Sequence, residues 1–465
     1  MSRYLSRWAL VFGGSIAALG CGAANDAQSE QLASTDQACL KAPALYTPPP
    51  DKGAIKQVAD LLMHRNIRDA ALVSGMIAAP QAVWFTGDTP ANTKKSVHVT
   101  MERARNHGTP VLVAYNLPFR DCSQYSAGGA ATVADYEAWI DGFAAGIGAG
   151  DAIVVLEPDG LGIIPWYNPF ADRDNWVPPG TLESCQPAGA DPATASTDRF
   201  AMLNYAVNAL KANAGTKVYL DATHSGWLGA GDAADRLLQA GVKQADGFFL
   251  NVSNYQPQPQ LEKYATWISK CIWFADPTSG SWGGGHAEWC GSQYSPANPN
   301  DFSTWGETDA KYASDVESQT WVPYPGDAGL KHFIIDTSRN GTGPLDASKY
   351  AASPYNQSAD VVSKLNAGSW CNPPGAGLGL RPKANPKADM PLLDAYLWIK
   401  IPGQSDGSCD IAGGARAWDY SAYNPWSAID QNHFDPLWGI TDPAAGAWFP
   451  QQALQLAQKA NPALF

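Results

Sequence analysis

The feature that most constrains the fold of this 465-residue chain is an alternation of short apolar runs with amphipathic segments. The apolar runs are rich in β-branched and aromatic residues and end at turn-forming residues, as strands buried in a parallel sheet do. Between them lie segments with apolar residues at helical spacing. The seven predicted strands are Ala71–Ala78, Pro110–Tyr115, Ala152–Glu157, Lys217–Ala222, Gly247–Val252, Lys331–Thr337 and Leu393–Lys400.

The clearest predicted helices are Ile55–Asn66, Val133–Ile147 and Thr197–Asn213. In the first of them, one apolar stripe at helical spacing predicts the face that packs on the core. The stripe consists of Ile55, Val58, Ala59, Leu62 and Met63. Repeated strand–helix units predict an α/β fold, a single parallel β/α barrel of the TIM-like kind over residues 51–465. A doubly wound open sheet is the alternative, although no G-x-G-x-x-G motif follows the first predicted strand.

Ionisable and amide side chains gather where the predicted strands end. The carboxyl ends of parallel barrel strands share one rim, and buried strand ends rarely carry so many such groups unless a site needs them. Any one of them could instead cap a helix or form a surface ion pair. The set as a whole predicts a functional site at this rim. Its members are Arg120, Asp121, Asp159, Asp221, His224, Asn251, Asn254, Asp336, Lys400 and Asp406.

The amino terminus predicts export. Arg3 and Arg7 precede an apolar run, residues 8–19, that is too short to span a bilayer. The sequence before Cys21 resembles a bacterial lipoprotein processing site, and an ordinary signal peptide is the alternative. We therefore expect a signal peptide over residues 1–21, a polar, proline-ended tether over 22–50, and a secreted or cell-surface bacterial protein.

The formal net charge of −13 argues against nucleic acids and anionic membrane surfaces as partners, whereas a neutral polymer is compatible with it. We expect a monomer. The eighteen tryptophans are numerous; they could fill a large core or offer flat faces on which sugar rings stack. Composition alone favours the core.

Eight cysteines are present, and export permits disulfides. If Cys21 is lipidated or removed and Cys39 stays unpaired in the tail, six cysteines remain. These six fall into three local pairs along the sequence, although spacing alone does not fix their connectivity. The three local pairs are Cys122 with Cys185, Cys271 with Cys290, and Cys371 with Cys409. No CxxC or HExxH spacing occurs and the seven histidines are scattered, so neither a metal site nor a cofactor is expected.

Two carboxyl groups suit acid catalysis. Asp159 ends the apolar run Val154–Asp159, and an aspartic acid keeps its proton near neutral pH only if burial or a like charge raises its pKa. Asp121, after the neighbouring predicted strand, could supply that charge or share the proton. We assign the acid role to Asp159 and a structural one to Glu157. Arg120 could hold Asp121 ionised, or the two could form an ordinary ion pair.

Several longer motifs now give a specific resemblance. Val113–Ser123, with Ser126, Ala127 and Gly129 beyond it, is similar to the first signature of glycoside hydrolase family 6, and Ile153–Asp159, with Leu161 and Gly162, is similar to the second. Further matches follow in order, so that the resemblance runs from about Pro50 to Phe465. Several long motifs in the right order are far stronger evidence than one short pattern. They are Leu220–Trp227, Asn251–Tyr255, Trp370–Asn372 and Ala445–Phe449.

The resemblance implies a distorted, partly open barrel that hydrolyses cellulose and cello-oligosaccharides by an inverting single displacement. Asp159 would be the proton donor and Asp121 the partner that tunes its pKa. Asp406 matches the position proposed as the base, which is unsettled in this family. Cys122–Cys185 and Cys371–Cys409 would be the family disulfides.

The resemblance also implies a set of substrate-binding residues. Tyr115 would lie under the distorted sugar, and Asp221 would belong to the charged cluster around the acid. Arg120 precedes Asp121 in the same loop. Trp84, Trp227 and Trp370 would stack on sugar rings, and Thr86, His224, Asn254, Lys400 and Gln404 would bind hydroxyls.

Three positions depart from the family pattern. Gly160 replaces a small or apolar residue, which we expect only to loosen a turn. Gln404 replaces a glutamate, so it keeps hydrogen bonds to sugar but loses a charge. The serine of a water chain could be Ser126, or its place could be taken by Ala127.

Two long segments, residues 256–330 and 410–443, predict how the substrate is cut, because long loops in a compact domain usually have a function. We expect them to roof the cleft into a tunnel, with Cys271–Cys290 stiffening the roof. The chain then looks most like the bacterial exo-acting cellobiohydrolases, which release cellobiose processively from a chain end. The alternatives are an open-cleft endo-1,4-β-glucanase and a non-catalytic cellulose-binding relative. A retaining barrel glycosidase is a further alternative.

Overall fold

The computed structural model describes residues 44–122, 125–167, 185–187, 189–366, 370–410 and 434–465. All of these belong to one structural unit, Ala42–Phe465. The predicted signal peptide, Cys21 and Cys39 lie outside the described residues. Within the described ranges, no helix has the length and apolar character that crossing a membrane requires.

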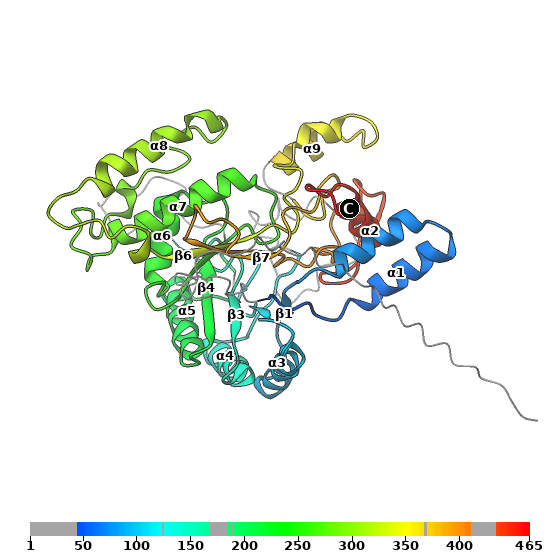
Figure 1. Ribbon diagram of the computed structural model, residues 1–465, viewed down its shortest axis with the longest axis horizontal. Helices are drawn as coiled ribbons and strands as arrows, with labels where there is room; N and C mark the ends of the chain where they lie inside the picture. The colour runs from blue at the N-terminus through cyan, green and yellow to red at the C-terminus, as the bar shows by residue number, and fades with distance from the viewer. Residues whose placement is uncertain (1–43, 123–124, 168–184, 188, 367–369, 411–433) are drawn as a thin grey trace, which may run out of the picture. The chain divides into compact units, whose positions relative to one another are not determined.

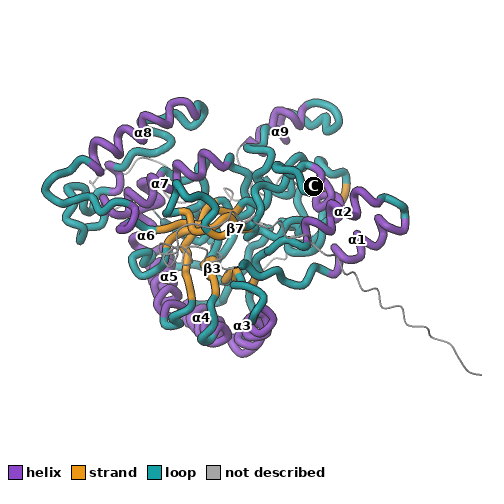
Figure 2. The backbone as a smooth tube through the Cα atoms, viewed as in Figure 1, coloured by secondary structure: helices purple, strands orange, loops and turns teal. Residues whose placement is uncertain are grey.

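One curled sheet of eight strands forms the centre, in the order β1-β2-β3-β4-β5-β6-β8-β7 (Figure 2). The seven strands from β1 to β8 in this order are parallel, and the two-residue β7 is antiparallel to β8. The predicted seven-stranded parallel sheet is therefore confirmed. The strands are β1 Val83–Phe85, β2 Val111–Ala114, β3 Ala152–Leu156, β4 Thr216–Asp221, β5 Gly247–Leu250, β6 His332–Asp336, β7 Lys383–Ala384 and β8 Leu393–Leu397.

The curl brings the β1 end of the sheet against the segment that follows β8. The backbone N–H of Ala82 donates to the carbonyl of Trp398 at 3.0 Å, and the indole of Trp84 donates to the carbonyl of Ile399 at 2.7 Å. No strand ladder joins β1 to β8. The fold is thus a distorted, partly open barrel, as the resemblance implied.

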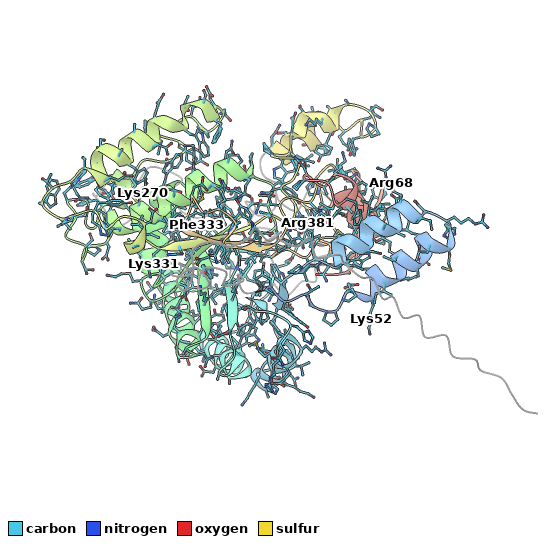
Figure 3. All side chains as sticks on the ribbon, viewed as in Figure 1. Lys52, Arg68, Lys270, Lys331, Phe333 and Arg381 are labelled. Carbon is cyan, nitrogen blue, oxygen red and sulfur yellow. A yellow bond between two sulfur atoms is a disulfide. The ribbon has the colours of Figure 1, made fainter. Side chains whose placement is uncertain are left out.

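Alternating side chains divide the apolar residues between two layers. Val111 and Val113 of β2 point into the barrel, where they meet Val155, whereas Leu112 and Ala114 join the layer beneath the helices. Strands buried on both faces need apolar residues at every position, which explains the unbroken apolar runs. Phe333 of β6, near the middle of the sheet in Figure 3, stacks on Phe248 with ring centroids 5.8 Å apart.

Helices α3, α4 and α5 lie side by side along the outer side of the sheet, and α6 packs against α7 (Figure 1). A second group, α1, α2 and α11, packs together. The described helices are α1 Lys52–Met63, α2 Ile67–Ile77, α3 Pro90–Ala104, α4 Val133–Ile147, α5 Ala195–Lys211, α6 Ala230–Gln239, α7 Gln258–Ala275, α8 Trp305–Tyr312, α9 Ala359–Asn366 and α11 Pro450–Gln458. Two short strands, β9 Phe434–Asp435 and β10 Ile440–Thr441, form a separate ladder.

The first predicted strand is wrong: Ala71–Ala78 lies almost wholly in helix α2. Asn66 caps this helix by accepting the N–H of Asp69, and Val73 and Met76 are buried on one face. A short apolar run is compatible with a strand or a buried helix, and here the cap and the helical neighbours decide. The actual first strand, β1, has only three residues.

The predicted core-facing stripe of α1 is wrong except at Val58, which packs against the core. Ile55, Leu62 and Met63 are 52%, 48% and 71% exposed. The buried face instead carries Ala54 and Gln57. Gln57 donates to the carbonyl of Pro450 and accepts from the indole of Trp448, so polar contacts with the start of α11 fix the orientation of this helix.

The last residues of the predicted tether, from residue 44 on, belong to the same structural unit as the barrel. Leu45 pairs with Thr109 in a parallel bridge, and the N–H of Tyr46 donates to the carbonyl of Thr109 at 3.0 Å. Tyr46 is buried.

Candidate active site

Three of the predicted site carboxyls follow three neighbouring strands. Asp121 comes after β2, Asp159 after β3, and Asp221 ends β4. Because these strands are parallel and adjacent, their carboxyl ends lie on one rim. The geometry therefore brings the three acids to the same part of the barrel, as the sequence predicted.

A strained turn sets the direction of Asp159. Glu157 and Asp159 have φ angles of +56° and +60°, a region that non-glycine residues rarely occupy. The turn is held by the buried carboxylate of Glu157, which accepts the N–H groups of Asn116 and Leu117 at 2.8 and 3.0 Å. Glu157 thereby links the loops after β2 and β3, which is the structural role predicted for it.

The position after the acid requires glycine. A Cβ on Gly160 would lie 2.7 Å from the carbonyl oxygen of Glu157 and 3.0 Å from the side chain of Leu117. The expectation that Gly160 only loosens a turn is therefore wrong. The buried guanidinium of Arg199 fixes the same turn by donating to the carbonyls of Gly160 and Ile163 at 2.7 and 2.8 Å.

Asp221 fastens the acid-bearing turn from the other side. Its carboxylate accepts the N–H groups of Leu161 and Gly162, both at 3.3 Å, and that of Thr223 at 3.0 Å. Burial raises the pKa of Asp221 to about 6 despite these hydrogen bonds. Asp221 is thus a second ionisable group close to the acid.

The carboxyl of Asp159 has other acids as its charged neighbours. Burial raises its pKa well above the ordinary value, and the negative charges of Asp221, Asp121 and Asp406 raise it further. Within the described chain, no hydrogen bond or ion pair engages this carboxyl group. This environment favours the protonated form of the Asp159 carboxyl over the ionised form.

Asp121 is held differently. The N–H of Ser126 donates to its carboxylate at 2.9 Å, and burial raises its pKa to about 6. Arg120 forms no ion pair with it. The guanidinium instead donates to the carbonyls of Thr86 and Tyr115, both at 2.5 Å, and lies over the Tyr115 ring. Arg120 thus lowers the pKa of Asp121 only through space.

Asp406 is an ion-paired carboxylate. Arg339 donates to both of its oxygens at 2.8 and 3.0 Å, Lys400 lies 2.8 Å away, and the N–H of Asn372 donates at 3.0 Å. Although burial opposes ionisation, the two cations hold the pKa of Asp406 well below its ordinary value. This carboxylate is therefore ionised throughout the usual pH range.

The loops that carry Asp121 and Asp406 are docked on each other. The hydroxyl of Ser126 donates to the carbonyl of Asp406 at 3.2 Å, and the hydroxyl of Tyr125 is bonded to Asp410. The Ser126 hydroxyl is thus engaged with backbone, whereas Ala127 offers no donor. The two charged loops form one wall of the site.

Arg339 and Asn372 were not among the predicted site residues. Arg339 is 2% exposed and follows β6 by three residues. An arginine so near a strand end was the available signal in the sequence. Asn372 belongs to the motif Trp370–Asn372, yet its role as a bridge to Asp406 and Asp442 depends on contacts between distant loops.

Aromatic side chains flank the carboxyls. Trp84 comes from β1 and meets Tyr115 edge to face, with ring centroids 5.4 Å apart. On the other side, the indole of Trp227 covers Gly162, because a Cβ there would lie 2.7 Å from the Trp227 ring. In the strand order, β2 and β3, which precede Asp121 and Asp159, lie between β1, which carries Trp84, and β4, which precedes Trp227.

The predicted hydroxyl-binding residues are placed less uniformly. Burial lowers the pKa of His224 to about 4, and its Nδ1 accepts from the N–H of Gly226, so the neutral ring carries its proton on Nε2. The amide of Asn254 donates to the carbonyl of Val252, and that of Gln404 to Asp51 at 3.4 Å. Thr86 is exposed. Trp370 lies against Tyr350, with ring centroids 6.3 Å apart.

All three predicted disulfides are present. They join Cys122 to Cys185, Cys271 to Cys290, and Cys371 to Cys409, with Cα–Cα distances of 5.8, 5.9 and 5.8 Å. The first is adjacent to Asp121 and the third encloses Asp406. Two of the three thus fix loops that carry site carboxyls.

The segment 256–330 does not form the predicted roof over the carboxyls. Its first part is helix α7, and Trp305 and Tyr312 of α8 bury against the outer core; Figure 1 shows α8 beyond α7, away from the strands. No described contact joins this segment to Asp121, Asp159 or Asp406. Of the second predicted roof segment, residues 411–433 lie outside the described residues.

The sequence matches the family model for glycosyl hydrolases family 6 over residues 40–460. Endoglucanase A of Cellulomonas fimi is 29% identical over 400 residues, covering 84% of this chain and 57% of that protein. Endoglucanase 1 of Streptomyces halstedii is 31% identical over 353 residues, covering 75% and 78%. Exoglucanase A of Cellulomonas fimi is 27% identical over 442 residues, covering 86% and 46%. The chain thus spans about half the length of the two Cellulomonas fimi relatives.

Among solved structures, the endoglucanase Cel6 from Mycobacterium tuberculosis is similar, with a TM-score of 0.55 and 27% identity. The alignment covers 90% of this chain and 98% of that one. That structure holds methyl-cellobiosyl-4-deoxy-4-thio-β-D-cellobioside.

Proposed function

Because the chain belongs to family 6 of the glycosyl hydrolases, we propose that it hydrolyses β-1,4-glucosidic bonds of cellulose and cello-oligosaccharides with inversion at the anomeric carbon. The observation that carries the proposal is the Asp159 carboxyl, which is partly buried, lies close enough to three other acids to feel their charge, and has no hydrogen bond or ion pair with the described residues. A glycosidase needs one such carboxyl to protonate the leaving oxygen. Trp84 and Trp227 on either side provide flat faces for sugar rings.

In the proposed reaction, Asp159 gives its proton to the glycosidic oxygen as the bond from that oxygen to C1 breaks. A water molecule attacks C1 from the opposite face, and its proton passes to a second carboxylate. The product therefore has the α configuration at its new reducing end. Asp159 ends ionised and the second carboxyl ends protonated, so both must exchange protons with solvent before the next turnover.

We assign the acceptor role to Asp121 rather than to Asp406. A proton acceptor works best when its pKa lies near the working pH, and burial raises the pKa of Asp121 to about 6. Arg339 and Lys400 lower the pKa of Asp406, which makes it a weak base. In this proposal Asp406 holds the ammonium of Lys400 in place toward the substrate.

Two measurements test the proposal. Proton NMR of the first product from cellohexaose should show the α anomer appearing before mutarotation, whereas a β anomer first would mean a retaining enzyme. Asp159→Ala should lose at least about a thousandfold in kcat while still binding cellohexaose, because the acid acts only in the transition state. Undiminished turnover by this variant would exclude Asp159 as the proton donor. If the wild-type chain binds glucan without cutting it, that result would support a non-catalytic cellulose-binding relative.

For the mode of attack we propose release of cellobiose from a chain end, as the length of the second predicted roof segment, residues 410–443, suggested. An open-cleft endoglucanase is the second candidate, because residues 276–330 pack on α6 and α7 and have no described contact with the acids. Viscosity and reducing sugar should be followed together on carboxymethylcellulose. A slow fall in viscosity per bond cut supports the first candidate, and a steep early fall supports the second.

We also propose that residues 1–21 are an export signal and that Cys21 is lipidated, with the residues of the predicted tether that precede the catalytic unit, 22–41, holding that unit at the cell surface. Labelled palmitate should be incorporated by the full chain expressed in a bacterium and lost in Cys21→Ser. Export without label would support an ordinary signal peptide.

A further inference from the structure

Exposed aromatic side chains are concentrated in the segment after α7. Of the seven large aromatic residues that are exposed in the described chain, five lie between residues 276 and 330. Burying aromatic surface is strongly favourable, so a cluster left in water at one segment calls for a ligand. The five are Trp282, Trp289, Tyr294, Phe302 and Trp321.

Tyr294 alone among the five has a described contact with the active-site loops. Its hydroxyl donates to the backbone carbonyl of Trp227 at 2.8 Å, and a Cβ on Gly229 would lie 3.8 Å from its ring. The side chain is nevertheless 44% exposed. The ring therefore lies on the turn between Trp227 and α6 and offers part of its surface to solvent.

The turn that carries Tyr294 is fixed by buried contacts. The fully buried side chain of Gln293 donates to the carbonyl of Leu228 at 2.8 Å. The hydroxyls of Thr308 and Tyr312 donate to the carbonyls of Ser292 and Gly291 at 2.8 and 3.0 Å, and the Cys271–Cys290 disulfide ties the turn to α7. Tyr294 is thus presented on a preorganised support, which lowers the entropic cost of binding.

Tyr294 contacts Trp227, which in turn packs on the turn that carries Asp159. Trp227 covers Gly162, which is three residues beyond Asp159, and the Tyr294 hydroxyl donates to the backbone carbonyl of Trp227. A glucan chain that stacks on Trp227 would pass onto this ring next. The neighbouring donors and acceptors are backbone groups and serines, which suit a neutral polyhydroxyl chain.

We propose that Tyr294 provides an additional glucosyl-binding position beyond Trp227, so that the segment 276–330 lengthens the substrate-binding surface instead of roofing it. The inference rests on the proposed function, since it takes the occupant of the Trp227 face to be a β-1,4-glucan. The exposed ring stacks on the C–H face of one further glucose unit. Its contribution therefore depends on substrate length.

The test compares kcat/KM for cellotetraose, cellopentaose and cellohexaose in the wild type, Tyr294→Ala, Tyr294→Phe and Phe302→Ala. Tyr294→Ala should lower the value for cellohexaose about three- to tenfold and leave cellotetraose within about twofold, as expected for the loss of one stacking contact. Tyr294→Phe keeps the ring and should stay near wild type. Phe302 is 40% exposed on the same segment and serves as the matched control.

An equal loss on all three substrates would overturn the inference, because Tyr294 would then act only by supporting Trp227. An unchanged length dependence in Tyr294→Ala would overturn it as well. Thermal unfolding of each variant identifies any that lose the fold; if Tyr294→Ala is among them, Tyr294→Leu, which fills similar space without a flat ring, takes its place in the comparison with Phe302→Ala. If the wild type cuts none of the three oligosaccharides, the proposed function itself fails, which is a distinct result.

Discussion

Asp121 and Asp406 have the same side chain and belong to loops that touch, yet their surroundings shift their pKa values in opposite directions. Burial without an ion-pair partner raises the pKa of Asp121 to about 6. Arg339 and Lys400 outweigh burial at Asp406 and lower its pKa. In the proposed mechanism, the different roles of the two carboxyls thus follow from their ion pairing, because Arg339 and Lys400 pair with Asp406 and not with Asp121.

The pH dependence of kcat/KM tests this division. The rate should rise as pH passes about 6, because Asp121 must be ionised, and fall as pH passes the raised pKa of Asp159, which must be protonated. Asp121→Asn removes a like charge from Asp159, so the alkaline limb of its residual activity should move to lower pH by about half to one unit. An alkaline limb that stays in place would show that Asp121 does not act on Asp159.

At the scale of elements, the loops at the rim are held by buried polar groups more than by apolar contacts. Asp336 shows this most clearly, since its carboxylate accepts N–H groups from the loops after β5, β6 and β8, at Ser253, Ser338, Ile399 and Lys400. The turn after β3 is held in the same way by Glu157, Asp221 and Arg199. Such hydrogen-bonded networks fix geometry, and a catalytic carboxyl requires that.

Gly160→Ala tests how closely the acid depends on its turn. The added Cβ would lie 2.7 Å from the carbonyl of Glu157, so the turn must move and carry Asp159 with it. We expect kcat/KM to fall about ten- to hundredfold, with a loss of about 1–3 kcal/mol in the free energy of unfolding. Gly306→Ala on α8 is the control, because nothing lies within 4 Å of its Cβ position. Equal activity of both variants would contradict the account.

At the scale of the whole molecule, much of the fold could be predicted because each buried strand of a parallel sheet must be apolar throughout. The central residues of β2, β3, β5 and β6 follow this rule, whereas β4 and β8 each carry a charged residue, Lys217 and Asp394, at their second position. Three features could not be predicted from local pattern. Helix α2 depends on its cap, and the orientation of α1 depends on polar contacts with distant residues. The path of residues 256–330 depends on the packing of Trp305 and Tyr312 against the outer core. The rim acids were predictable from the strand ends, and the same signal was present for Arg339, whereas its pairing with Asp406 depends on contacts between distant loops.

The stability of the whole chain should decrease as pH rises. Burial raises the pKa values of Asp121, Asp221 and Asp435 to about 6 and that of Glu157 to about 7. Unfolding returns these groups to about 4, so between pH 4 and 7 the folded chain binds more protons than the unfolded chain. Their stabilising effect is complete below pH 4 and is lost as pH passes the folded values. Urea midpoints should thus be lower at pH 7.5 than at pH 5; a higher midpoint at pH 7.5 would contradict this balance.

The most direct test of the central claim is a carbon-13 NMR titration of the Asp159 carboxyl, assigned by comparison with Asp159→Asn, with glucan bound. The account predicts that this carboxyl remains protonated at pH values where exposed aspartates, with pKa values near 4, are ionised. A carboxyl that titrates near pH 4 would contradict it, because no proton would then be available for the leaving oxygen.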